Sequence, residues 1–209
     1  MAADAVLVLD RLSSERDDVP LFTELSLTMG AGDVVQLAGP NGSGKTTLLR
    51  ILMGLSSQYQ GNISWRGTAM PKGRVEFLAD TLYLGHNAGV KAALTPLENL
   101  RWTGALCSPV DDNAIFAALE KVGLAGYEHQ PCYALSAGQQ RRVSLARLFC
   151  SPASLWVLDE PFTAIDLAGV AEIESWIDQH AESGGMVLLT THHSLSLSRP
   201  PRVLSLEAQ

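Results

Sequence analysis

The sequence lacks a long apolar run and an excess of basic residues. None of its hydrophobic stretches approaches the roughly 18 residues that a membrane-spanning helix requires. Lys and Arg number 15 against 22 Asp and Glu, which gives a net charge of −7. This balance argues against nucleic acid as the main partner and provides no polybasic membrane anchor. We therefore expect a chain that binds no nucleic acid and is held at a membrane only through a partner.

Cysteine is also scarce. The chain has three, Cys107, Cys132 and Cys150, an odd number without the spacing of a metal site. We expect reduced thiols, as in a cytosolic protein, and a packing role for Cys150.

The chain is long enough for one α/β domain with an inserted subdomain. It has 209 residues, of which 46% are hydrophobic. Short apolar segments bounded by glycines predict strands at 6–9, 25–29, 34–38 and 62–65. Continuous apolar runs at 155–158 and 186–190 are typical of buried parallel strands, and a helix is expected between them at about 167–181.

The segment from about residue 95 to 150 is predicted to be helical. Asp112 can cap a helix whose apolar face carries Ile115, Leu119 and Val122. A second helix, over 139–150, is expected to keep three arginines outside its apolar face: Arg141, Arg142 and Arg147. The order of elements predicts a parallel-sheet core with antiparallel strands at its start and a helical insertion in its middle.

A phosphate-binding loop follows the predicted strand at 34–38. It fits the pattern G-x-x-x-x-G-K-[ST] and consists of Gly39, Pro40, Asn41, Gly42, Ser43, Gly44, Lys45 and Thr46, with Thr47 next in the helix. The glycines let backbone N–H groups converge on an anion, and Lys45 adds a charge for the phosphates. The Thr46 hydroxyl is placed to ligate Mg²⁺. Because a strand precedes the loop and a helix follows it, an accidental glycine-rich turn is disfavoured and a nucleoside triphosphate is the predicted ligand.

Two carboxylates end the apolar run at 155–158. Asp159 can hold Mg²⁺ beside the phosphate loop, and Glu160 can polarise a water for attack on the γ-phosphate. An Asp-Glu pair after a strand would say little alone. Together with the phosphate loop it predicts hydrolysis of the nucleotide.

The segment 135–142 opens a helix before that strand and reads Leu-Ser-Ala-Gly-Gln-Gln-Arg-Arg. Ser136 and the N–H groups of the next two residues can bind a phosphate at the helix start. Alternatively, Ser136 is an N-cap and the glutamines are solvated. The residues alone do not decide between these interpretations.

In order and spacing, the motifs resemble those of the ATP-binding cassette (ABC) ATPases: phosphate loop, signature at 135–142, Asp-Glu pair and a late histidine, His192. The resemblance implies an α/β P-loop NTPase fold, with a parallel core sheet, an antiparallel β subdomain and a helical subdomain. It implies a single ABC ATPase domain over 1–209. The nucleotide-binding core would comprise 1–85 and 151–209, and the helical subdomain 86–150.

The resemblance also implies roles for individual residues. Two copies would associate head to tail with ATP, the signature of one covering the phosphates held by the other; its residues are Ser136, Ala137, Gly138 and Gln139. Ala137 stands where glycine is frequent, which is tolerable if its φ is negative. Asp166 matches the D-loop and can also cap the next helix. His192 matches the histidine that contacts the γ-phosphate, whereas His193 would point to the other side of an extended chain.

Two positions depart from the family pattern. His86 stands where a glutamine normally senses Mg²⁺ and the γ-phosphate, and Asn87 is the alternative for this role. No aromatic ring is evident for stacking on adenine, and Arg16 offers its planar guanidinium instead. Phe22 is expected in the core.

More narrowly, the chain resembles the ATP-binding subunits of bacterial cytochrome c maturation systems, also called haem exporter ATPases. The Gly85-His86 pair, the alanine in the signature and the run at 162–166 carry this resemblance. It implies ATP and Mg²⁺ as cofactors, integral membrane subunits as partners and a peripheral position on the cytoplasmic face of the bacterial inner membrane. Hydrolysis would power haem export or the release of a haem-loaded chaperone.

Other functions compete with this interpretation. An ABC ATPase that serves a different cargo has the same motifs. A non-transport clamp for DNA repair or translation would need a second cassette or a long coiled-coil insertion, and a small-molecule kinase has no use for the signature.

Overall fold

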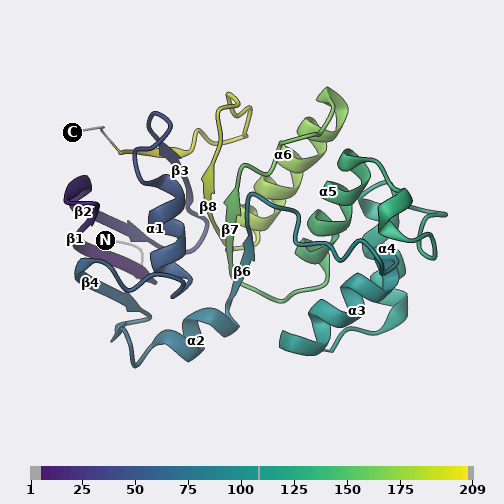
Figure 1. Ribbon diagram of the computed structural model, residues 1–209, viewed down its shortest axis with the longest axis horizontal. Coiled ribbons are helices and arrows are strands. Elements are labelled where there is room, and N and C mark those ends of the chain that lie inside the picture. The colour runs from purple at the N-terminus through teal and green to yellow at the C-terminus, as the bar shows by residue number, and fades with distance from the viewer. Residues whose placement is uncertain (1–5, 108, 207–209) are drawn as a thin grey trace.

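The computed structural model describes residues 6–107 and 109–206, and Figure 1 shows a central parallel sheet with antiparallel strands at one end and helices at the other. The described elements confirm the predicted α/β architecture. They are, in chain order, β1 (Leu7–Arg16), β2 (Val19–Met29), β3 (Val34–Ala38), α1 (Lys45–Leu52), β4 (Gln60–Trp65), β5 (Thr68–Ala69), α2 (Arg74–Ala79), β6 (Thr81–Leu84), α3 (Pro96–Cys107), α4 (Asp112–Lys121), η1 (Cys132–Ala134), α5 (Ala137–Ala146), η2 (Arg147–Phe149), β7 (Leu155–Asp159), α6 (Leu167–Glu182), β8 (Met186–Thr190) and β9 (Arg202–Ser205).

The parallel sheet has the strand order β6-β7-β8-β3-β9. Its strands β7 and β8 are buried along their whole length, as their continuous apolar sequences predicted. Along β7, Trp156 and Leu158 pack toward the helical side, while Leu155 and Val157 pack with α1 and the antiparallel sheet. Because these strands are parallel, their carboxyl ends meet at one edge, where the loops after β3, β7 and β8 come together.

The antiparallel sheet has the order β2-β1-β4-β5, and its first two strands are longer than predicted. β1 continues past residue 9 to Arg16, and β2 begins at Val19 instead of residue 25. Asp17 and Asp18 form the tight turn between them, with φ of 52° and 61°. Register irregularities interrupt the pairing of the two strands, so the hairpin tip lacks the regular apolar alternation from which its extent could be predicted. Phe22 is 4% exposed, which confirms its place in the core.

Helices α3, α4 and α5 lie together beyond the parallel sheet (Figure 1). The predicted apolar face of α4 is confirmed, because Ile115, Leu119 and Val122 are all fully buried. Its N-cap is Asp111, not Asp112: Asp111 Oδ1 accepts a hydrogen bond of 2.7 Å from Asn113 N. Asp112 instead begins the helix and forms an ion pair with Arg101. The predicted boundaries between the nucleotide-binding core and the helical subdomain, at 85/86 and 150/151, stay a prediction.

The prediction that Arg141 lies outside the packed face of its helix was wrong. α5 ends at Ala146, a 3₁₀ turn continues it to Phe149, and Arg141 is only 3% exposed. Its guanidinium donates hydrogen bonds to backbone carbonyls next to the end of β7, and these replace water around the charge. Arg142 and Arg147 are partly exposed.

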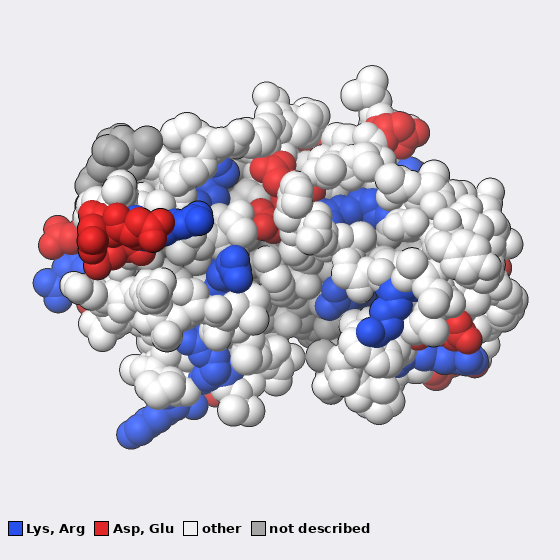
Figure 2. Space-filling model, viewed as in Figure 1, with Lys and Arg blue, Asp and Glu red and all other residues white. Residues whose placement is uncertain are grey.

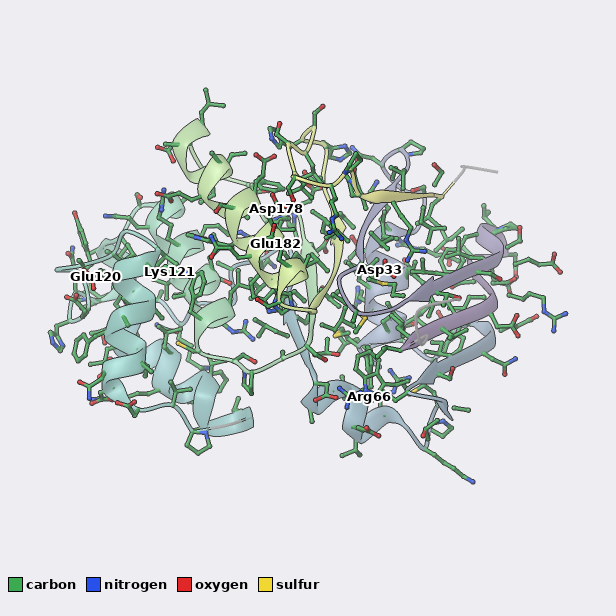
Figure 3. The ribbon with its side chains drawn as sticks, turned by 180° about the vertical axis from the view of Figure 1, so that it is seen from behind. Asp33, Arg66, Glu120, Lys121, Asp178 and Glu182 are labelled. Atoms are coloured by element: carbon green, nitrogen blue, oxygen red, sulfur yellow. The ribbon has the colours of Figure 1, made fainter. Side chains whose placement is uncertain are left out.

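On the reverse of the molecule, α6 holds the segment between β8 and β9, and Asp33, directly before β3, holds the start of β9 (Figure 3). Asp178 accepts hydrogen bonds of 2.9 Å from both N and Oγ of Ser198. Asp33 forms an ion pair of 2.9 Å with Arg202. These contacts fix the chain that follows the strand end carrying His192.

The described part of the chain holds no helix that is both long and apolar enough to cross a membrane. Within that part, Cys132 and Cys150 are free thiols, and the side chain of Cys107 lies outside the description. Cys150 packs at the margin of the core, where burial raises its pKa to about 11. The expected packing role of Cys150 is thus confirmed.

Candidate functional site

A pocket of about 510 Å³ lies at the carboxyl edge of the parallel sheet. Figure 2 shows blue and red side chains close together near the middle of this face. Residues that the sequence predicted separately line the pocket together: Asn41, Gly42, Gly44, Lys45, Thr46, Thr47, His86, Asp159, Glu160 and His192. Arg16, which the sequence offered for stacking on adenine, lines it as well, and the remaining lining residues are Leu21, Thr163 and Thr190.

The phosphate loop connects β3 to α1 through a backbone that requires glycine. Gly42 and Gly44 have φ of 87° and 93°, in the left-handed region that other residues rarely adopt. Lys45 Nζ donates to the carbonyls of Gly39 and Pro40 at 2.7 and 3.0 Å, so its charge lies over the loop. The Ser43 hydroxyl is buried and has no hydrogen-bond partner among the described residues. The left-handed glycines and the charge of Lys45 fit a phosphate group at this loop.

Asp159 and Thr46 bring two oxygen ligands together beside this loop. Asp159 is 2% exposed, and its Oδ2 lies 3.4 Å from Thr46 Oγ1. Burial, and to a smaller extent the charge of Asp159, raises the pKa of the nearby Tyr83. The described residues contain no group of three His, Cys, Asp or Glu that could hold a metal ion. A hydroxyl and one carboxylate fit Mg²⁺, which takes its other oxygen ligands from phosphates and water.

Glu160 follows Asp159 in a strained conformation. Its φ is 52°, a region that costs a residue other than glycine about 1–3 kcal/mol. Its N–H donates to the carbonyl and the hydroxyl of Thr190 at 3.2 and 3.0 Å. The carboxylate Oε1 lies 3.7 Å from His192 Nε2. A carboxylate and an imidazole that face each other across a pocket can together orient a water.

His193 points away from this pair, as the alternation of an extended chain predicts. Its Nε2 lies 3.4 Å from Glu174 Oε1 on α6, and its ring packs on Phe162. Glu174 is 7% exposed and also accepts a hydrogen bond of 2.7 Å from Ser196 N. The two adjacent histidines therefore make different contacts: His192 faces the pocket, and His193 connects the same loop to α6.

The signature segment forms a capped helix start. Ser136 Oγ accepts from Gln139 N at 3.2 Å, and Gln139 Oε1 accepts from Ser136 N at 2.9 Å, which is a capping box. Ala137 lies in the first turn of α5, so its φ is negative and its methyl group is tolerated. A Cβ on Gly138 would come within 2.8 Å of the carbonyl of Ala164, so this approach requires glycine.

Asp166 is the N-cap of α6, as predicted. Its Oδ1 accepts from Gly169 N at 3.2 Å and lies 3.4 Å from Arg142 Nη2, which ties the D-loop to the signature helix. The pocket lining includes none of the described residues Ser136 to Gln139 and not Asp166. In this chain, the signature and the pocket are separate surfaces.

A sequence model of the ABC transporter family matches residues 22–163. The chain belongs to the ABC transporter family. This ABC protein is therefore an ATP-binding protein and an ATPase, which agrees with the phosphate loop and the adjoining carboxylates.

Several curated relatives of this ABC ATPase carry the name cytochrome c biogenesis ATP-binding export protein CcmA. The protein from Hahella chejuensis is 56% identical, covering 97% of this chain and 96% of its own. The protein from Saccharophagus degradans is 53% identical, covering 89% of this chain and 86% of its own.

Solved structures agree with the fold of this ABC ATPase. One described as an ABC transporter ATP-binding protein, from Pyrococcus furiosus, has a TM-score of 0.82 at 27% identity and covers 96% of both chains. An ATP-binding cassette in its ADP conformation has a TM-score of 0.75 at 20% identity, covering 91% of this chain and 82% of its own. Because the second structure is only 20% identical, its similarity supports the fold alone.

Thr190 is a residue of this site that no motif predicted. Its only sequence signal is a polar side chain at the end of the apolar run 186–190, and the pairing of Asp159 with Thr190 across β7 and β8 gives it its place. His86 lines the pocket, whereas Asn87 does not. Arg16 also reaches the lining, from the tip of the β1–β2 hairpin.

Proposed function

We propose that this ABC ATPase is the ATP-hydrolysing subunit of a membrane complex for c-type cytochrome biogenesis. The observation that carries the proposal is 56% identity over 97% of the chain to a protein named for cytochrome c biogenesis and export. ATP hydrolysis would power haem export or the release of a haem-loaded chaperone. A different cargo, the alternative kept open by the motifs, has no comparable support.

In the proposed mechanism, residues 39–47 bind the phosphates of ATP, with Lys45 and the helix start supplying positive charge. Thr46 and Asp159 would hold Mg²⁺, which would neutralise charge on the phosphate oxygens. Glu160 acts as the general base that orients and deprotonates the attacking water. His192, 3.7 Å from the Glu160 carboxylate, contacts the γ-phosphate.

The remaining site residues act around this centre. Two copies associate head to tail, so that Ser136, Ala137, Gly138 and Gln139 of one copy cover the γ-phosphate bound by the other. The separation of the signature from the pocket of its own chain supports this arrangement. Asp166 links the two ATP sites of the dimer. His86 takes the place of the glutamine that senses Mg²⁺ and the γ-phosphate, and Arg16 stacks on the adenine base. Both His86 and Arg16 line the pocket.

The proposed partners are integral membrane subunits, with the chain peripheral on the cytoplasmic face of the bacterial inner membrane. Nucleic acid is not proposed as a partner, because the net charge is −7 and acidic and basic side chains are interspersed on the face seen in Figure 2. The helical subdomain at 86–150 would move against the core at 1–85 and 151–209 as ATP binds and is hydrolysed.

The test is a complementation experiment in a bacterium that lacks its own CcmA. The chain is supplied as wild type, as Glu160→Gln and as Glu120→Gln, an exposed control on α4, and c-type cytochromes are stained for covalent haem. We expect wild type and the control to restore haem attachment and Glu160→Gln to fail at an equal protein level. Normal cytochromes with stable Glu160→Gln, or no rescue by wild type, would contradict the proposed function.

A further inference from the structure

Arg141 is the one Lys or Arg that is buried in the described chain, at 3% exposed. In the described residues its guanidinium forms no direct ion pair, and the carboxylates of Asp159 and Glu160 act on it only at longer range. Its guanidinium instead donates to four backbone carbonyls: Gly85 at 3.1 Å, Asp159 at 3.2 Å, Glu160 at 2.7 Å and Pro161 at 3.3 Å. A buried charge without a direct ion pair needs such hydrogen-bond acceptors in place of water.

Three of these acceptors are consecutive and include the strained residue of the site. Glu160 has a φ of 52°, and its peptide groups are held from both sides. Thr190 accepts from its N–H at 3.0 Å, and Arg141 donates to its C=O at 2.7 Å. Because both neighbouring peptide planes are fixed, the direction in which the Glu160 side chain leaves the backbone is fixed as well.

The fourth acceptor lies on another segment. Gly85 follows β6 and directly precedes His86, which lines the pocket. One guanidinium on the signature helix α5 therefore joins the end of β7 to the end of β6. The planar fork of arginine makes this possible, since the single ammonium of lysine cannot reach carbonyls in so many directions.

We propose that Arg141 is a positioning residue for ATP hydrolysis. Its hydrogen bonds to the carbonyls of Glu160 and Gly85 fix the backbone there. They thereby orient the Glu160 carboxylate and His86 toward the pocket. The proposal rests on the proposed role of Glu160 as the base. Arg141 makes none of the pocket lining itself, so its loss should affect the hydrolytic step and not the binding of ATP.

The test compares Arg141→Gln with Arg101→Gln, which removes an exposed arginine from α3. For each full-length protein, the ATP dissociation constant is measured by calorimetry and kcat by release of labelled phosphate. We expect Arg141→Gln to lower kcat by about tenfold or more with ATP affinity changed by less than about threefold, since misplacing a catalytic group costs that much. The control should match wild type in both. An unchanged kcat, or a parallel loss of affinity and kcat, would overturn the proposal.

A double-mutant cycle separates positioning from a general loss of structure. If Arg141 acts through Glu160, adding Arg141→Gln to Glu160→Gln should change the residual rate by less than about threefold. The same tenfold loss in both backgrounds would overturn the proposal. If Arg141→Gln does not fold, Arg141→Lys carries the same comparison, because it keeps the charge but not the fork. If Glu160→Gln alone turned over ATP as fast as wild type, Glu160 would not be the general base. That result would contradict the proposed mechanism and is distinguishable from a failure of the Arg141 proposal.

Discussion

The Thr190 hydroxyl donates a hydrogen bond of 2.7 Å to Asp159 Oδ1 across the neighbouring strands β8 and β7. The same hydroxyl accepts the N–H of Glu160 at 3.0 Å. One short side chain thus orients the carboxylate of Asp159 and the backbone of Glu160. Asp159 is 2% exposed, so water cannot readily replace a lost partner.

Replacing Thr190 by valine keeps the shape of the side chain and removes its hydroxyl. We expect the free energy of unfolding to fall by about 1–3 kcal/mol, because Asp159 and the Glu160 N–H each lose a partner. The Mg²⁺ concentration for half-maximal hydrolysis should rise, since Asp159 is no longer held in one orientation. Urea unfolding and ATPase assays across Mg²⁺ concentrations measure the two effects. Thr190→Ser, which restores the hydroxyl, is the control, and a valine variant equal to wild type would refute the role.

Removing the charge of Lys45 should weaken nucleotide binding. A charge-assisted hydrogen bond contributes about 1.5–3 kcal/mol, so Lys45→Ala should raise the dissociation constant for ATP by about 10–100-fold in a calorimetric titration. Lys72→Ala, an exposed lysine on the loop before α2, should bind as wild type does. Equal affinities for the two variants would contradict the assignment of the phosphate loop.

Neutralising Glu160 should separate binding from turnover. Glu160→Gln keeps the size of the side chain and its backbone hydrogen bonds, so ATP affinity should stay within about threefold of wild type. Turnover should fall by about 10²–10⁴-fold, the usual contribution of a positioned base. The measurement is steady-state phosphate release beside calorimetry. Turnover within a factor of about three of wild type would exclude Glu160 from this role.

The motifs of this site could be predicted because each is contiguous in sequence. The phosphate loop lies between a strand and a helix that are recognisable from local sequence alone, and the Asp-Glu pair ends an unbroken apolar run. Arg141 could not be placed from its sequence, because an arginine in an amphipathic helix normally faces water. Its burial depends on carbonyls supplied by β7 and by Gly85, which are distant in the chain.

Thr190 and the full extent of the β1–β2 hairpin could not be predicted either, for two different reasons. Thr190 becomes part of the site only through its pairing with Asp159 in the parallel sheet. The hairpin tip from about residue 13 to 20 is polar and irregular in register, so no local periodicity marked it as strand.

His180 should make stability fall as the pH is lowered. Its ring stacks on Trp156 at 3.8 Å, and burial lowers its pKa below the ordinary 6.5. The unfolded chain therefore takes up a proton at a higher pH than the folded chain, and stability is lost as pH falls from about 6.5 toward the lowered value. Urea unfolding between about pH 7.5 and pH 5 should show this slope, and it should be smaller in His180→Gln than in wild type. His129→Gln controls for loss of an exposed histidine, and equal slopes for wild type and His180→Gln would refute the prediction.

Glu174 should support hydrolysis from outside the pocket. It is 7% exposed on α6 and accepts Ser196 N at 2.7 Å, with His193 Nε2 at 3.4 Å, so it holds the loop that carries His192. Glu174→Ala leaves both groups without their acceptor. We expect a loss of about 1–3 kcal/mol in the free energy of unfolding and a lower kcat, because His192 is less firmly placed opposite Glu160. Glu174→Gln keeps an acceptor for Ser196 and should be milder in both assays. Glu182→Ala, an exposed carboxylate on the same helix (Figure 3), is the matched control. If Glu174→Ala and Glu182→Ala have the same unfolding free energy and kcat, then the loop does not depend on this contact.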